Sequence, residues 1–264
     1  MSVFSELKQA SRIATESGFL DLLRAIWYMK IHRQPEEYVS QVYCEELSQH
    51  VVVRRYTSDI YCLPHIVREL EYRHLSGLRN PKVIVDLGAN VGYTTLWLKK
   101  QYPSSTIIAV EPSLSNFRLL QRNVELSGYT DIVTINAGIW DREGYLSAVD
   151  VDTSEMWTRQ FVFCDHATAS TVPVITLQSL MQKYKLTYID VLKVDIEGAE
   201  RHLLADQSID WPRCVGVLAI ETHLDPYYGD TGPLLLSLLA KHSHDIQHFS
   251  QTHTVRFQQE AHAG

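Results

Sequence analysis

Short runs of aliphatic and β-branched residues alternate with longer segments of helical periodicity from Lys82 onward. Such alternation is typical of a parallel, doubly wound α/β sheet whose two faces are covered by helices. The pattern predicts five strands: Val83–Leu87, Thr106–Val110, Ile132–Ile135, Ile189–Val194 and Val215–Ile220. It predicts helices between and after these strands: Tyr93–Gln101, Ser113–Ser127, Leu177–Tyr184, Ala199–Ala205 and Gly232–Lys241.

Two later runs, Ile246–Ser250 and Thr254–Phe257, predict a closing antiparallel pair. With them the sheet is expected to have seven strands, mostly parallel, with an antiparallel last strand. The segment from Gly144 to Val174 has weaker helix signals. We interpret it as an insertion that adds a hairpin on the substrate side of the sheet.

The first 80 residues have a different pattern. Residues 1 to about 33 look helical, and two strands, Val51–Val53 and Ile60–Leu63, are predicted around a polar turn, followed by a helix from Pro64 to about His74. Asn80-Pro81 marks a boundary. We therefore predict an N-terminal helical and hairpin extension over residues 1–80, serving as a cap or flap, and a main domain over residues 81–264 with an insertion at about 144–174. The N-terminal helices are a candidate contact for a homodimer.

Charge and cysteine content restrict the partners. The formal net charge of -7 gives no general attraction to a phosphate backbone, so we expect a small-molecule substrate and no nucleic acid. The beginning of the chain lacks the apolar run of an export signal, and no apolar stretch reaches the roughly 20 residues that cross a bilayer. The four cysteines are widely spaced, as expected of reduced side chains. A cytoplasmic protein without a membrane partner is the prediction.

Candidate chemistry lies where the predicted strands end, because open α/β sheets bind ligands outside the carboxyl ends of their strands. The first strand runs into the sequence Asp86-Leu-Gly88-Ala89-Asn90-Val-Gly92, in which glycines allow a tight turn close to a ligand. The second strand runs into Glu111-Pro112-Ser113. A carboxylate some 20 residues beyond a glycine turn can accept both hydroxyls of an adenosine ribose.

The spacing of the glycines distinguishes between cofactors. A dinucleotide fingerprint is G-x-G-x-x-G, whereas Gly88 and Gly92 stand four apart with Asn90 between them. This favours a nucleoside ligand that has no pyrophosphate. The alternatives are a glycine turn that serves only packing and, for Glu111, a solvated strand end.

Four segments then carry a family resemblance: VIVDLGANVGYTTLWL, AVEPS, VPVITLQSLMQKYKLTYIDVLKVDIEGAE and IETH. They resemble the FkbM-type methyltransferases, class I S-adenosylmethionine-dependent O-methyltransferases that act on sugars and secondary metabolites. The likeness runs from about Val52 to Phe249, and its most specific element is KVDIEGAE. The chain departs from the family where it has Gln178 in place of a frequent Asp, and the variable Gly144–Ser170 stretch leaves the substrate open.

The resemblance implies a Rossmann-like class I fold and S-adenosyl-L-methionine as the cofactor. Gly88, Asn90 and Gly92 would line its methionine and ribose portions, Glu111 would hold the ribose hydroxyls, and the segment from Asn136 to Gly138 would border the adenine. The expected cofactor site comprises Asp86, Gly88, Ala89, Asn90, Gly92, Glu111, Pro112, Ser113, Asn136, Ala137, Gly138 and Asp195.

The expected reaction needs an aligned acceptor oxygen and a group that removes its proton. Asp195 follows the fourth strand, and Glu221 and His223 follow the fifth. His223 is the first candidate for the general base because an imidazole titrates near neutral pH, while Asp195 or Glu221 could orient it or take the proton. The alternative for His223 is a satisfied histidine in the pocket wall.

Asp195, Glu197, Glu221 and His223 could also assemble an oxygen-rich Mg²⁺ site. We do not expect a metal, because acids such as Glu197 and Glu200 are also favoured at a helix start by the helix dipole. At least one of those two is expected to be structural. Three other functions stay open: an N-methyltransferase, a nucleic-acid methyltransferase, and a non-catalytic binding module with this fold.

Overall fold

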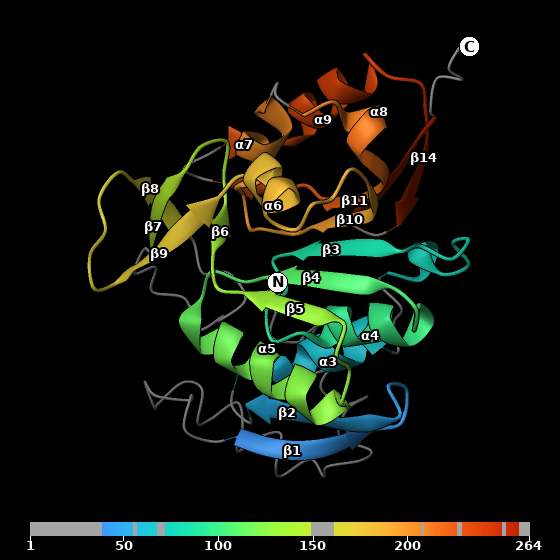
Figure 1. The fold of residues 1–264 in the computed structure, drawn as a ribbon, viewed down its shortest axis with the longest axis vertical. Coiled ribbons are helices and arrows are strands. Elements are labelled where there is room, and N and C mark those ends of the chain that lie inside the picture. The colour runs from blue at the N-terminus through green and yellow to red at the C-terminus, as the bar shows by residue number, and fades with distance from the viewer. Residues whose placement is uncertain are drawn as a thin grey trace, which may run out of the picture.

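A seven-stranded sheet runs through the middle of the molecule (Figure 1). The computed structural model describes residues 39–54, 57–67, 72–148, 161–206, 209–225, 229–249 and 252–258. The strand order is β14-β15-β11-β10-β3-β4-β5. The strands are β3 (Val83–Leu87), β4 (Thr106–Val110), β5 (Ile132–Ile135), β10 (Ile189–Val194), β11 (Val215–Glu221), β14 (His244–Phe249) and β15 (Thr252–Phe257).

The pairing confirms the predicted fold class. β5, β4, β3, β10 and β11 are parallel to one another, and β15 pairs antiparallel with both β11 and β14. The antiparallel strand is thus the last strand of the chain, as the sequence predicts. From β3 the chain continues to β4 and β5 on one side and later to β10 and β11 on the other. The strand order therefore switches between β3 and β10, and such sheets bind ligands at the carboxyl ends of the strands at this point.

Alternate residues of each central strand face opposite sides of the sheet. In β3, Val85 and Leu87 belong to one hydrophobic cluster, whereas Ile84 belongs to another. The first cluster is covered by α6 (Leu177–Lys183), α7 (Glu200–Ala205), α8 (Trp211–Cys214) and α9 (Gly232–Leu239). The second side is covered by α3 (Asp59–Val67), α4 (Tyr93–Gln101) and α5 (Leu114–Ser127), as Figure 1 shows.

The prediction for the N-terminal extension is wrong for one strand and for the start of the following helix, since α3 begins at Asp59 and contains Pro64. Strand β2 (Gln49–Arg54) pairs with β1 (Val39–Cys44), and the run Ile60–Leu63 lies in helix α3. Apolar residues Ile60, Leu63 and Val67 recur at helical spacing on the side that packs into the core. A short β-rich run cannot be told from a helix by its residue types alone, so the periodicity was the better guide.

The hairpin of β1 and β2 packs into the same hydrophobic cluster as α3 and α4. Val52 donates its N–H to Asn123 Oδ1 at 2.6 Å, and Tyr93 Oη donates to the carbonyl of Val52 at 2.8 Å. These bonds tie the hairpin to α5 and α4. The boundary at residues 80/81 and a cap or flap role stay predictions, and the predicted N-terminal helices with their dimer contact lie outside the described residues.

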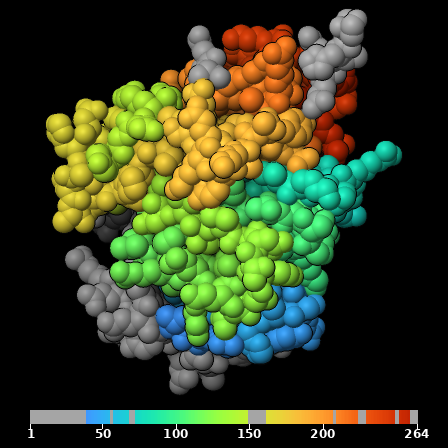
Figure 2. All heavy atoms as spheres, in the orientation of Figure 1, coloured from blue at the N-terminus to red at the C-terminus, as the bar shows by residue number. Residues whose placement is uncertain are grey.

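A second, four-stranded sheet stands beyond the carboxyl end of β5 (Figure 1). Its strands are β6 (Gly138–Ile139), β7 (Gly144–Ala148), β8 (Phe161–Cys164) and β9 (Thr171–Ile175). β7 pairs antiparallel with β8 and β9, which agrees with the hairpin predicted for the insertion. In the space-filling view the insertion protrudes from the left edge of the molecule, in yellow (Figure 2).

Two predictions concern the environment of the chain. None of the four cysteines, all of them described, forms a disulfide; Cys44 is buried and the other three are half-buried. No described helix combines the length and apolar character that a bilayer span requires. Two further short strands, β12 (Leu224–Asp225) and β13 (Gly229–Asp230), form a small hairpin after β11.

A fully buried ion pair joins Arg54 and Asp59 near the N-terminal edge of the described residues. Arg54 Nε and Nη2 donate to the two carboxylate oxygens of Asp59 at 2.8 and 2.7 Å, and both side chains are at most 1% exposed. We predict that Asp59→Ala lowers the free energy of unfolding by about 3–5 kcal/mol, because it strips a buried guanidinium of its bidentate partner. Urea unfolding measures this.

The matched control is Glu125→Ala. Glu125 pairs with Arg122 at 3.3 Å on the surface of α5, where both side chains are more than half exposed. Its removal should change the free energy of unfolding by no more than about 0.5 kcal/mol. Equal losses in the two variants would contradict the assignment of Arg54–Asp59 as a stabilising core pair.

Candidate active site

The turn after β3 packs against the end of β10. Gly88, Asn90 and Gly92 have φ values of 75°, 50° and 92°. A Cβ at Gly88 would lie 1.7 Å from the carbonyl oxygen of Asp195, so only glycine allows this approach. The N–H groups of Gly88 and Ala89 both donate to Val110 O at 3.0 Å. The turn is thus fixed between the ends of β4 and β10.

The carboxylate of Glu111 lies directly under this turn. Its Oε2 accepts the N–H of Asn90 at 2.9 Å, its Oε1 accepts the N–H of Ser113 at 2.8 Å, and Asn116 Nδ2 lies 3.5 Å from Oε1. Glu111 is only 5% exposed. Burial raises its pKa from 4.5 to about 7, although these donors and the charge of Lys193 act in the opposite direction.

Buried acceptors without partners accompany Glu111. Among the described residues, the Oδ1 atoms of Asn90 and Asn116 have no hydrogen-bond partner. An orphaned buried carbonyl oxygen is costly, so a ligand that donates N–H or O–H groups would stabilise this corner. The structure therefore places unused acceptors beside the predicted ribose carboxylate, which removes the interpretation of Glu111 as a solvated strand end.

The predicted adenine border is arranged differently for each of its residues. Asn136 Nδ2 donates to the carbonyls of Glu111 and Pro112 at 2.9 and 3.0 Å, and so links the ends of β4 and β5. Ala137 is 1% exposed and packs into the core. A Cβ at Gly138 would lie 2.1 Å from Leu146 Cδ1. Asn136, Ala137 and Gly138 therefore hold the backbone around the site in place.

Asp86 lies inside the protein beneath the turn. It is 0% exposed, and its carboxylate accepts Thr95 Oγ1 at 2.6 Å and lies 3.1 Å from Lys193 Nζ. The ammonium of Lys193 also donates to the carbonyl of Gly88 at 2.8 Å and lies 3.5 Å from Asp195 Oδ2. Asp86 therefore stabilises the ammonium of Lys193, and Lys193 in turn holds the carbonyl of Gly88 in the turn.

Sequence reasoning missed Lys193 and Tyr72. Lys193 is a charged residue inside a strand that is otherwise apolar at its buried positions, and that exception was the available signal. Tyr72 Oη lies 3.4 Å from Asp195 Oδ2, and its ring is 5.9 Å from Lys193 Nζ. No pattern around Tyr72 marks it, because the contact joins residues 123 positions apart.

His223 stands among four carboxylates. Its Nδ1 lies 2.8 Å from Glu200 Oε1, within hydrogen-bond distance. Its Nε2 lies 3.9 Å from Asp195 Oδ1, 3.8 Å from Glu197 Oε2 and 3.7 Å from Glu221 Oε1. The structure thus brings together the three predicted catalytic residues, Asp195, Glu221 and His223, with Glu197 and Glu200.

The acids around His223 change its protonation. Burial lowers its pKa, but the hydrogen bond to Glu200 and the charges of Glu200, Glu197 and Asp195 outweigh burial and raise the pKa from 6.5 to about 10. Burial, with the negative charges of Asp195, Glu221 and Glu200, raises the pKa of Glu197 well above its usual range. In the ion-free chain the imidazole therefore carries a proton that the carboxylates stabilise.

Glu200 is the structural acid expected at the helix start. It begins α7, is 0% exposed, and accepts the N–H groups of Ile196 and Gly198 at 3.0 and 2.9 Å. Glu197 has a φ of 53°, a left-handed conformation, and it is followed by Gly198 at 100°. This tight turn directs Glu197 toward His223, while Glu200 holds the imidazole from the other side.

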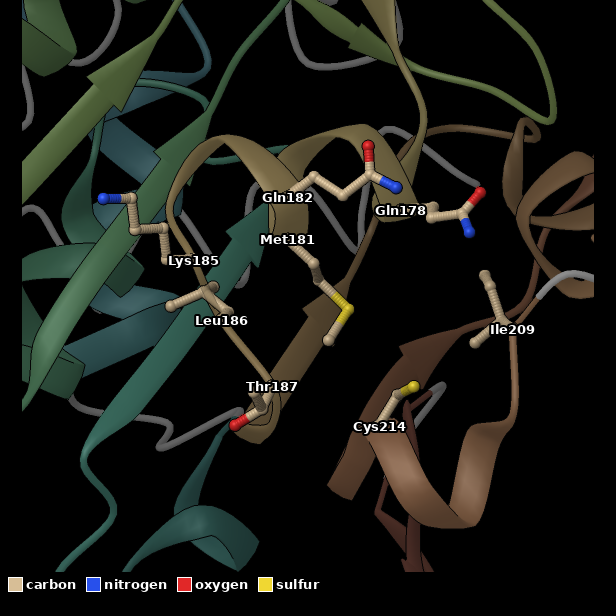
Figure 3. A pocket seen from close by; sticks show the side chains of 8 residues that line it. All are labelled: Gln178, Met181, Gln182, Lys185, Leu186, Thr187, Ile209 and Cys214. Atoms are coloured by element: carbon tan, nitrogen blue, oxygen red, sulfur yellow. The ribbon is translucent and has the colours of Figure 1, made fainter.

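A groove of about 550 Å³ lies at the amino ends of the strands, away from the glycine turn and His223 (Figure 3). It is lined by Gln178, Met181, Gln182, Lys185, Leu186, Thr187, Ile209 and Cys214. Thr187 precedes β10 and Cys214 precedes β11, so the groove is at the amino ends of these strands. None of the residues that line the groove is a candidate site residue, since those lie at the carboxyl ends of the strands.

The model of the methyltransferase FkbM domain matches residues 86–254. This range includes the glycine turn and the acid cluster, by which we mean His223 with Asp195, Glu197, Glu200 and Glu221. The chain belongs to the FkbM methyltransferase family. It is 28% identical over 174 residues to Methyltransferase 1 of Beauveria bassiana, across 55% of this chain and 70% of that protein.

Another relative is the 31-O-demethyl-FK506 methyltransferase FkbM of Streptomyces tacrolimicus, which is 27% identical over 192 residues, 62% of this chain and 74% of its own length. Among solved structures, the methyltransferase FkbM of Methylobacillus flagellatus matches with a TM-score of 0.45 and 17% identity. That match covers 90% of this chain and 60% of the other.

The close approach at Gly88 gives a prediction for this FkbM-family turn. Gly88→Ala should lower the free energy of unfolding by about 3 kcal/mol, because its Cβ would overlap the backbone oxygen of Asp195 and force β3 and β10 apart. The matched control is Gly128→Ala at the end of α5, where φ is 71° and nothing lies within 4 Å. That variant should lose only about 1 kcal/mol. Thermal and urea unfolding measure both losses of unfolding free energy. Equal losses would contradict the close contact of Gly88 with Asp195.

Proposed function

We propose that the chain transfers a methyl group from S-adenosyl-L-methionine to a hydroxyl oxygen of a small molecule, such as a sugar or a secondary metabolite. The family and the name of the Streptomyces tacrolimicus relative support O-methylation. The observation that carries the proposal is the convergence of Asp195, Glu221 and His223 beside the Gly88 turn. Hydroxyl methylation requires a proton acceptor next to the donor site.

The residues at the glycine turn suit this cofactor. An ionised carboxylate offers about four acceptor positions. In Glu111 two of them accept backbone N–H groups and a third faces Asn116 Nδ2 at 3.5 Å, so Oε2 still has room for a ribose hydroxyl. The orphaned Oδ1 atoms of Asn90 and Asn116 offer further acceptors for the nucleoside. Gly88, Ala89, Gly92, Pro112 and Ser113 would contribute backbone around it.

When bound, S-adenosylmethionine supplies a methyl group that is already activated by its sulfonium charge. The protein then has to align the acceptor oxygen and take up its proton. We assign the proton to the group formed by Asp195, Glu221 and His223. Since His223 is protonated in the ion-free chain, a carboxylate is the group that can accept, while the imidazolium holds Asp195 and Glu221 in place.

The four-stranded sheet that contains the insertion is the proposed wall of the acceptor site, because it stands beyond the carboxyl end of β5. Trp140 is 2% exposed and stacks on His202 and Phe163, with ring centroids 3.8 and 5.8 Å away. Its buried indole supports the insertion from inside. Because Trp140 is buried, residues of the insertion would contact the acceptor. A cytoplasmic location and a homodimer remain part of the proposal.

The cofactor assignment predicts a coupling between binding and protonation. S-adenosylhomocysteine should bind better as the pH rises to about 7, because hydroxyls donate to the ionised Glu111 and lower its pKa, so that binding releases protons. At pH 6.5 the release should approach about 0.75 proton per ligand, because a carboxyl group with a pKa of about 7 is about three-quarters protonated there. Calorimetry in two buffers of different ionisation enthalpy measures it.

Glu111→Gln is the control for this measurement. It should weaken binding at pH 8 by at least about tenfold, since a charged acceptor is lost, and should abolish the proton release. Micromolar binding of NAD without binding of S-adenosylhomocysteine would refute the cofactor assignment. Unchanged affinity in the variant would remove Glu111 from the ribose role.

The reaction itself is tested with S-adenosylmethionine carrying a ¹³C-labelled methyl group and a panel of sugars and hydroxylated metabolites. The label should appear on oxygen, as carbon NMR distinguishes from N-methyl products. Asp195→Asn and Glu221→Gln should each lower kcat by about 100-fold through loss of proton acceptance. Asp245→Asn, an exposed change on β14, should leave kcat unchanged.

The alternatives predict different products. Labelled nitrogen in an amine substrate would establish an N-methyltransferase, and labelled RNA with salt-dependent binding would establish a nucleic-acid enzyme. Binding of S-adenosylhomocysteine without transfer to any class of acceptor would favour a binding module. Each of these results overturns O-methylation of a small molecule.

A further inference from the structure

We propose that Asp195, Glu197 and His223 bind a divalent cation of the Mn²⁺ type, with Glu221 beside it as the proton acceptor. The proposal deepens the function of the same site, and its chemical role rests on the proposed methyl transfer. It replaces our expectation from the sequence that no metal is bound. Cation binding can be measured without any reaction.

The distances leave room for an ion. One ligand atom from each of Asp195, Glu197 and His223 lies within 4.8 Å of the other two. His223 Nε2 is 3.9 and 3.8 Å from the Asp195 and Glu197 oxygens, too far for a hydrogen bond. Atoms that share an ion at bond lengths of about 2.1–2.2 Å lie roughly 3.0–4.4 Å apart. The two distances from His223 Nε2 fall within this range, and the Asp195 and Glu197 oxygens are at most 4.8 Å apart, so small side-chain movements bring all three around a common centre.

Groups outside these three ligands orient the imidazole. Its Nδ1 is engaged by Glu200, which is fully buried and held by two backbone N–H groups. A carboxylate on one ring nitrogen leaves the other nitrogen for a metal and fixes the ring, as is usual for metal-binding histidines. His223 Nε2 thus faces the site on a rigid support.

Asp195 is oriented in the same way. Its Oδ2 lies 3.4 Å from Tyr72 Oη and 3.5 Å from Lys193 Nζ, both outside the cluster. Its Oδ1 remains directed toward His223. Two of the three ligands therefore use one atom to hold their position and present the other atom to the same point.

The donor set selects the class of cation. Two carboxylates and one imidazole are harder than a zinc site rich in thiolate and softer than an all-oxygen magnesium site. Mn²⁺ accepts such a mixture. Asp195, Glu197 and Glu221 are 26%, 30% and 13% exposed, so a dication would offset their mutual repulsion in a partly desolvated place.

A bound cation would bind the acceptor oxygen and make its hydroxyl more acidic. The O–H proton passes to the carboxylate of Glu221. The O–CH₃ bond forms as the S–CH₃ bond of S-adenosylmethionine breaks, and the S–C electron pair stays on sulfur. This assigns Glu197 a role as ligand that sequence reasoning left open.

The test titrates Mn²⁺ into the full chain after EDTA treatment and dialysis, with the loss of the free-ion EPR signal as the readout. One Mn²⁺ per chain should bind in the micromolar range. Glu197→Gln and His223→Ala should weaken binding by at least about tenfold. Glu143→Gln, an exposed change just before the insertion, should bind like the wild type.

Glu197→Gln keeps the shape of the side chain, so its result stands even if His223→Ala fails to fold, and circular dichroism checks both. Absence of Mn²⁺ binding by the wild type, or unaltered binding by Glu197→Gln, would overturn the cation site. S-adenosylhomocysteine binding on the same samples separates the two proposals. Binding of S-adenosylhomocysteine without Mn²⁺ overturns only the cation, and Mn²⁺ binding without S-adenosylhomocysteine overturns only the cofactor.

Discussion

The buried ammonium of Lys193 is the interaction on which the carboxyl edge of the sheet depends. It is 2% exposed and contacts the side chain of Asp86, the carbonyl of Gly88 and the side chain of Asp195. A buried charge is tolerated only when it is paired and hydrogen-bonded, so these groups must remain near one another. The glycine turn on β3 and the acid on β10 are thereby held in fixed relative positions.

A second constraint is the buried carboxylate of Glu200, which fixes the position of His223. Glu200 holds the His223 ring with one oxygen and the backbone of residues 196 and 198 with both. Because it starts α7 and is fully buried, the position of His223 follows the position of that helix. Asp195 and His223 lie in the short segments directly after β10 and β11, and these buried contacts hold their side chains in place, as an aligned methyl transfer needs.

The sequence predicted the central sheet well because its strands are continuous apolar runs between clear helices. Val83–Leu87 and Thr106–Val110 agree with the structure at both ends. The run Ile60–Leu63 was mistaken because its β-rich composition hid a helical spacing. Strand β1 escaped notice because its residues do not alternate between apolar and polar types.

The candidate site was predictable in its list of residues and not in their contacts. Glu111, Asp195, Glu221 and His223 were marked by their position after strands. The ammonium beneath the turn could have been suspected from one charged residue in a buried strand. The contact of Tyr72 with Asp195 depends on how the N-terminal extension folds back, and local pattern carries no information about it.

Asp195 links the donor side of the site to the acceptor side. Its backbone oxygen limits the residue at position 88 to glycine, its Oδ2 meets Tyr72 and Lys193, and its Oδ1 faces His223. A shift of the turn would thus move the same residue that presents a carboxylate to the acid cluster. Backbone packing, buried charge and proton acceptance are therefore coupled at one position, and the donor turn and the acid cluster cannot be adjusted independently.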